Sequence, residues 1–195
     1  PWFLGQKLSL GTDLYYRDLI FLSPEYDQTN VGASVFLRKP VGRRSYIKGE
    51  YRVETIEIEA ENNTSQVFKD EEDKYLRSAL SLNYVYDSRD SNRLPRRGHK
   101  VDLGLIYAGG LLAGDVDTMT FTGSGTKHWS LPFDTILTAR GSFAVVDSHG
   151  GDDNLPIFER QFLGGARDLR GIQIRDIGPR DATGPNATQE VLGLQ

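Results

Sequence analysis

Apolar and polar side chains alternate with a period of two residues in seven segments of the first 148 residues, and this alternation limits the folds open to the chain. In "KLSLGTDLYYR" (7–17), for example, leucine and tyrosine alternate with charged and small residues. Similar segments occupy 30–38, 46–54, 74–87, 100–107 and 137–146, and a less regular, threonine-rich one occupies 116–131. A period of two predicts strands whose two faces meet different surroundings. The sequence therefore predicts an all-β, antiparallel protein of about seven strands.

The polar faces of these segments indicate where the sheet lies. They carry charges of both signs in mid-strand, at Asp13, Lys48, Glu50, Arg52, Arg77, Asp102 and Arg140. A charged lumen opposite an apolar, lipid-facing band is the arrangement of a transmembrane β-barrel. Tyrosines near the strand ends suit the two membrane interfaces, at Tyr16, Tyr46, Tyr84, Tyr86 and Tyr107. A soluble β-sandwich binding module also alternates and stays the alternative.

The connections between the strands alternate in length. Those at 39–44 and 131–135 are short, as periplasmic turns are, and the one at 88–98 is of middling length. Between them fall the segments 21–29 and 57–73, the longer loops expected outside. The acidic run 70–73 is expected to be a solvated loop. We divide the chain into barrel strands at 1–148 and one long extracellular loop at 149–195. Seven strands do not close an ordinary membrane barrel, so we expect a single domain that is incomplete at both ends.

Composition argues against several kinds of site. The chain has no cysteine, three dispersed histidines and a net charge of −4, so we expect no metal, no cofactor and no nucleic-acid partner. No serine, histidine and acidic set has catalytic spacing, and we expect no enzyme and no catalytic residue. Asp87 and Asp90 could be read as a metal or catalytic pair, but a turn salt-bridged by Arg89 and Arg93 is favoured.

Two dispersed motifs carry a family resemblance. The first, "YDSRDSNRLPRRG" (86–98), contains a turn motif made of Asp87, Arg89, Asp90, Arg97 and Gly98. The second, "PIFERQFLGGARDLRGIQIRDIGPRD" (156–181), contains glycines and a proline for packing and turns, at Gly164, Gly165, Gly178 and Pro179. At its centre stand Leu169, Arg170, Gly171 and Ile172, where Ile172 replaces the aromatic residue of the family motif Val-Arg-Gly-Phe. In their order and spacing, the two motifs resemble the outer-membrane assembly insertases of the BamA type, in the outer-membrane protein 85 (surface antigen D15) superfamily.

The resemblance implies a position in a larger protein. The seven strands would be the fifth to eleventh of a sixteen-stranded barrel, and 149–195 would be the sixth extracellular loop, folded back into the lumen. Arg170 would latch that loop to carboxylates on strands beyond residue 195, because a guanidinium makes directional, bidentate bonds to a carboxylate.

The resemblance also implies a function in the bacterial outer membrane. The whole protein would assemble and insert other outer-membrane proteins. Its partners would be the lipid bilayer, nascent outer-membrane proteins, accessory assembly lipoproteins and its own POTRA domains. A polypeptide-translocating channel of the two-partner secretion or TamA type is the alternative within the same superfamily.

Overall fold

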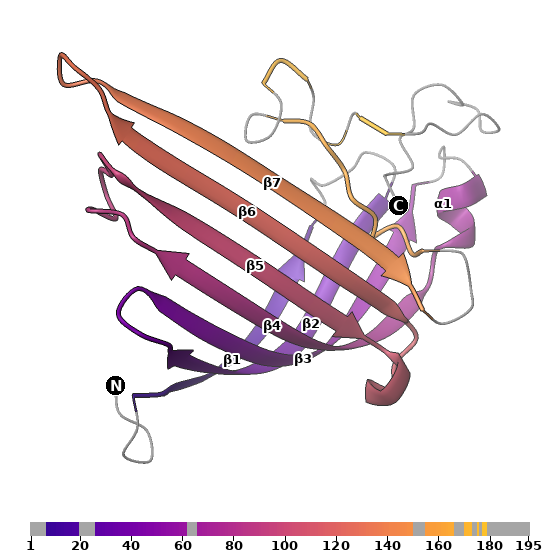
Figure 1. Cartoon of the computed structure of the whole chain (residues 1–195). Coiled ribbons are helices and arrows are strands. Elements are labelled where there is room, and N and C mark those ends of the chain that lie inside the picture. Colours follow the sequence, from indigo (N-terminus) through magenta and orange to yellow (C-terminus); the bar gives the residue numbers. More distant parts are fainter. Residues whose placement is uncertain are drawn as a thin grey trace.

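The predicted all-β architecture is confirmed in the computed structural model, which describes residues 7–19, 26–61, 66–149, 155–165, 170–172, 175 and 177–178. Seven strands form one antiparallel sheet in chain order (Figure 1). They are β1 (Ser9–Asp18), β2 (Tyr26–Pro40), β3 (Ser45–Ala60), β4 (Lys74–Asp87), β5 (Gly98–Ala108), β6 (Thr118–Ser130) and β7 (Ile136–Ser148). Within the described ranges the helical elements are α1 (Gln66–Asp70) and the 3₁₀ turn η1 (Gly110–Leu112). Among the described residues, no helix is long and apolar enough to cross a membrane.

The register gives the sheet one apolar and one polar face. One cross-strand row, for example, joins Val35 to Tyr51, Tyr51 to Leu80 and Leu80 to Tyr107. We call this side the outer face. Its apolar side chains stand exposed, Leu14 at 86% of its surface. The opposite, inner face carries the mid-strand charges, as the alternation predicts.

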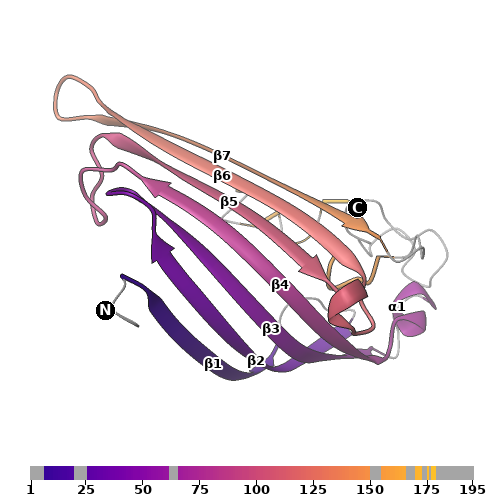
Figure 2. The ribbon, with the colours of Figure 1, turned by 60° about the horizontal axis from the view of Figure 1, so that its bottom comes forward.

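The sheet curves into an open trough, and its connections differ between the two ends (Figures 1 and 2). The turns at 41–44, 88–97 and 131–135 lie at one end, which we call the short-turn end. At the other end lie α1, η1 and the chain that leaves β7. Within the described chain β1 and β7 are the two edges of the sheet and do not pair with each other.

Two aromatic residues, Tyr46 and Phe36, lie on the polar inner face for different reasons. Tyr46 pairs with Val85 and lies under the guanidinium of Arg38, 3.6 Å from the ring centre. The prediction that Tyr46 lies at a membrane interface is therefore wrong, because its register position is on the inner face and not on the lipid-facing one. Phe36, the apolar exception on a polar face, covers Gly11 on the neighbouring strand, where a Cβ would lie 2.4 Å from its ring. The missing side chain of Gly11 thus makes room for an inward phenyl ring.

Candidate functional site: a chain segment docked on the inner face

The segment 155–165, beyond β7, packs on the inner face near the end that carries α1. Ile157 is 1% exposed and completes a hydrophobic cluster on the inner face, whose other members are Tyr26, Ile56, Ile58 and Phe68. These side chains come from β2, β3 and α1. Segments far apart in sequence therefore share one small core at this end of the sheet.

A tight turn presents the docking residues of the segment. The amide of Glu159 donates to the carbonyl of Pro156 at 3.0 Å, and the amide of Arg160 donates to that of Ile157 at 3.3 Å. The turn buries Ile157, Glu159 and Arg160 together. An apolar, an acidic and a basic side chain thus enter the interface within four residues, and each needs a matching partner on the sheet.

Glu71, directly after α1, is the first partner. One carboxylate oxygen accepts the amide of Ile157 at 2.5 Å, and the other accepts Nη2 of Arg160 at 2.7 Å. Arg160 Nε also donates to the carbonyl of Leu155 at 2.7 Å. Burial raises the pKa of Glu71 above its ordinary 4.5, while the Ile157 amide and the charge of Arg160 act in the lowering direction. The predicted solvation of the 70–73 run is therefore wrong for Glu71, which is only 8% exposed.

Arg77 of β4 is the second partner. Its Nη1 donates to Glu54 of β3 at 3.1 Å, and its Nε donates to Glu159 of the docked segment. The hydroxyl of Tyr15 donates to the other oxygen of Glu54 at 2.7 Å. One buried guanidinium therefore joins the wall of the trough to the segment that fills it, with its charge balanced by two carboxylates.

The chain beyond the turn folds on itself. Leu163 and Ile177 form a β-bridge, and the amide of Gly165 donates to the carbonyl of Ile172 at 3.1 Å. The guanidinium of Arg175 lies 3.5 Å from the centre of the Phe162 ring. Gly164 and Gly165 both adopt positive φ, 123° and 93°, which favours glycine there.

The predicted latch residues are placed only in part. Arg170, Gly171 and Ile172 are exposed, while Leu169 and Pro179 lie outside the described residues. In the part of the chain that the structure describes, no carboxylate pairs with Arg170. Gly178 has a positive φ of 156° beside the bridge residue Ile177. The latch role of Arg170 stays a prediction, since its expected partners lie beyond this chain.

The turn motif between β4 and β5 folds into a hydrogen-bonded unit at the short-turn end. Asp87 binds Arg89 at 2.6 Å, and Oδ1 of Asp90 accepts the amides of Arg96 and Arg97 at 3.0 and 3.3 Å. These amide bonds hold the pKa of Asp90 below its ordinary value. The predicted ion pair with Arg89 is therefore confirmed, whereas within the described residues Arg93 forms no ion pair and backbone amides bind Asp90 instead. Among the described residues, no group of histidine, cysteine or acidic side chains could hold a metal ion.

Gly98 closes this turn and offers a direct test of backbone packing. Its φ is +102°, and an added Cβ would lie 2.5 Å from the carbonyl oxygen of Ser88. We expect Gly98→Ala to lower the free energy of unfolding by about 1–3 kcal/mol, because alanine is strained at this φ and its Cβ meets the Ser88 carbonyl oxygen. Urea unfolding of the full-length protein in micelles measures this loss. Gly42→Ala is the control. Gly42 also has a positive φ, 84°, but an added Cβ there would meet no atom nearer than 3.9 Å. Equal losses in the two variants would contradict a role for the close approach to Ser88.

Known proteins share both the sequence pattern and the fold of this sheet. A family model described as the Omp85 superfamily domain matches residues 1–193. The chain belongs to the Omp85 superfamily. The crystal structure of BamA from Haemophilus ducreyi lacking POTRA domains 1–3 matches 99% of this chain and 41% of its own, with a TM-score of 0.82 at 19% identity. The Omp85 chain thus has the fold of a segment of an outer-membrane β-barrel, and we assign it to the outer membrane.

Two relatives of this Omp85 chain are named for assembly. The outer membrane protein assembly factor BamA of Nitratidesulfovibrio vulgaris is 27% identical over 175 residues, which are 89% of this chain and 22% of the relative. The human sorting and assembly machinery component 50 homolog is 35% identical over 107 residues, 54% of this chain and 22% of the relative. The chain therefore spans about a fifth of the length of these relatives.

Sequence reasoning pointed to the second motif but missed the residues that dock it. Ile157, Glu159 and Arg160 lie in "PIFER", inside the quoted motif, whereas Glu71 and Arg77 lie more than eighty residues earlier. The available signal was a charge pattern: one acidic and one basic residue in "FER", flanked by apolar residues in a loop. A loop with buried charges needs opposite charges on the wall that it covers.

Proposed function

We propose that the protein to which this chain belongs assembles and inserts other outer-membrane β-barrel proteins. The observation that carries the proposal is the Omp85 match over 1–193, together with relatives named for outer-membrane protein assembly and for sorting and assembly. The role is non-enzymatic. An incoming strand cannot lie in lipid with unpaired backbone groups, and a barrel that offers a template edge lowers that cost.

Within this function, the part played by the chain is structural. The outer face supplies lipid-facing wall, and the docked segment 155–165 fixes the curvature of β2, β3 and β4 through Glu71 and Arg77. We propose that the whole of 149–195 folds back into the lumen, with Arg170 as a second attachment point. The partners are nascent outer-membrane proteins, the protein's own POTRA domains and accessory assembly lipoproteins.

Depletion of the full-length protein tests the function. The folded fraction of several unrelated outer-membrane barrels, measured by heat-modifiable migration on gels, is expected to fall together within a few generations. Re-expression of the wild type restores it. If these barrels fold normally and one secreted polypeptide is lost from the medium instead, the protein is a translocation channel and the insertase proposal is wrong.

A further inference from the structure

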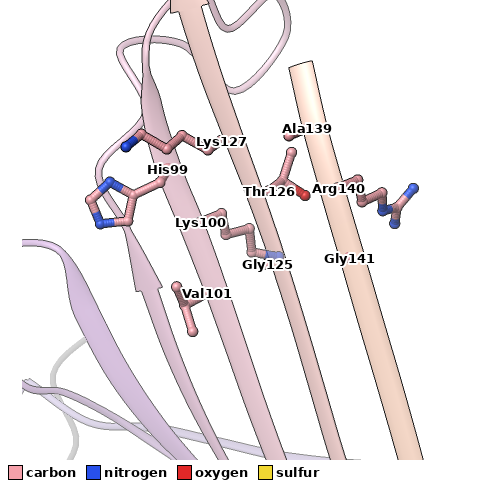
Figure 3. Close-up of a pocket in the computed structure, with 9 residues that line it drawn as sticks. All are labelled: His99, Lys100, Val101, Gly125, Thr126, Lys127, Ala139, Arg140 and Gly141. Carbon is pink, nitrogen blue, oxygen red and sulfur yellow. The ribbon is translucent and has the colours of Figure 1, made fainter.

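The outer face carries a hollow across β5, β6 and β7 near the short-turn end (Figure 3). Its volume is about 530 Å³. Two cross-strand rows of outward positions line it: Val101, Gly125 and Gly141 in one row, and His99, Lys127 and Ala139 in the other. The row between them, Lys100, Thr126 and Arg140, also lines it, although its register positions face inward. The hollow lies outside the docked-segment site, on the opposite face of the sheet.

The floor of the hollow is bare backbone. Gly125 and Gly141 pair directly across β6 and β7, and a Cβ at either position would meet nothing within 4 Å. The hollow is bounded along β6. On one side the ring of Phe143 covers Gly123, where a Cβ would lie 2.3 Å from it, and on the other side stands Trp129. An extended, apolar chain of small cross-section fits such a floor between the larger side chains of Val101, Phe143 and Trp129.

Two basic side chains stand on the rim. Lys127 and His99 are register partners, and both project to the same side of the sheet (Figure 3). Aromatic rings hold them: the Lys127 ammonium lies 5.1 Å from the Trp129 ring, and the His99 ring stacks on Tyr86 at 5.2 Å. Within the described residues no carboxylate pairs with Lys127. Tryptophan and tyrosine favour the level of lipid headgroups, so this rim lies where phosphates are found.

We propose that the hollow is a binding site for one anionic glycerophospholipid. The lipid phosphate lies between Lys127 and His99, and one acyl chain runs over Gly125 and Gly141. Charge complementarity selects the headgroup, since basic side chains at a membrane surface attract anionic lipid. A lipid contacts both the basic rim and the bare floor at Gly125 and Gly141, whereas a free anion would contact the rim alone. The floor therefore favours a lipid. This inference does not depend on the proposed function.

Native mass spectrometry of the full-length protein tests the site, with phosphatidylglycerol and phosphatidylcholine of identical acyl chains as probes. The wild type is expected to retain phosphatidylglycerol preferentially. In Lys127→Gln, the ratio of retained phosphatidylglycerol to retained phosphatidylcholine should fall about fivefold. Gly125→Val, which fills the floor, should lose binding of the retained lipid altogether. Lys127 is exposed, so its substitution leaves the fold intact.

Matched controls exist on the same sheet. Lys74→Gln removes an exposed charge on β4, outside the hollow, and Gly49→Val fills an open outer-face position paired with Leu37 and Leu82. Both should behave as the wild type. Equal retention of the two lipids by the wild type, or an equal loss in Lys74→Gln, would overturn the site. If soluble glycerol phosphate at the same concentration displaces the lipid, only the phosphate is bound, and the proposed contact of the acyl chain with the floor is wrong.

Discussion

Replacement of Arg77 by methionine is expected to release the docked segment and to loosen the wall beneath it. Arg77 is the only charge that bridges Glu54 and Glu159 among the described residues, and the side chains of the two carboxylates are 5% and 9% exposed. Without the guanidinium, two buried negative charges face each other. Breaking a buried pair by removal of one partner costs about 3–5 kcal/mol. Amide hydrogen exchange over 155–163 and the Tm of the full-length protein measure the loss.

The exposed pair of Lys74 and Glu57 provides the control for this prediction. Its side chains are 62% and 46% exposed, and Lys74→Met should cost at most about 0.5 kcal/mol. Adding Glu159→Gln to Arg77→Met should restore part of the protection, because it removes one uncompensated charge. If Arg77→Met accelerates exchange no more than Lys74→Met, Arg77 does not hold the segment.

Replacement of Arg160 by methionine is expected to undock the segment while the wall stays intact. It leaves the Glu71 carboxylate buried with the Ile157 amide but without its charge partner, again at a cost of about 3–5 kcal/mol. Exchange at the Ile157 amide should rise, whereas amides of β3 and β4 should keep their protection. Conversion of the pair to Glu71→Leu with Arg160→Met should recover only part of the docking, because no charge stays buried but the Ile157 amide loses its acceptor.

Acidification should restore docking in the Arg160→Met variant. Burial already raises the pKa of Glu71 above 4.5, and the variant lacks the charge of Arg160 that acts in the lowering direction. For a group whose pKa is raised by docking, the linked stability is fully present below 4.5 and is lost as the pH rises through the docked-state pKa. Exchange protection at Ile157 should therefore increase as the pH falls from neutral toward 4.5. A decrease over that range would show that Glu71 is not the buried charge responsible.

The strands and their faces could be predicted from the sequence because the information is local. Each residue on β3, from Lys48 to Glu54, has neighbours two positions away on the same face, so the alternation alone places it inward or outward. Tyr46 shows the limit of that reasoning: its position near a strand end favoured an interface, but its register position faces inward, under Arg38. A residue type typical of an interface does not override the pleat.

The docking of the chain beyond β7 was decided by the tertiary structure. Sequence order and composition determined that a glycine-rich, charged segment follows the sheet, and a family motif marked it. Which charges it meets depends on the register of β2, β3 and β4, which brings Glu71 within reach of Arg160 across 89 residues and Arg77 within reach of Glu159 across 82. Because a charge removed from water must be paired, burial makes each of these ion pairs necessary for docking.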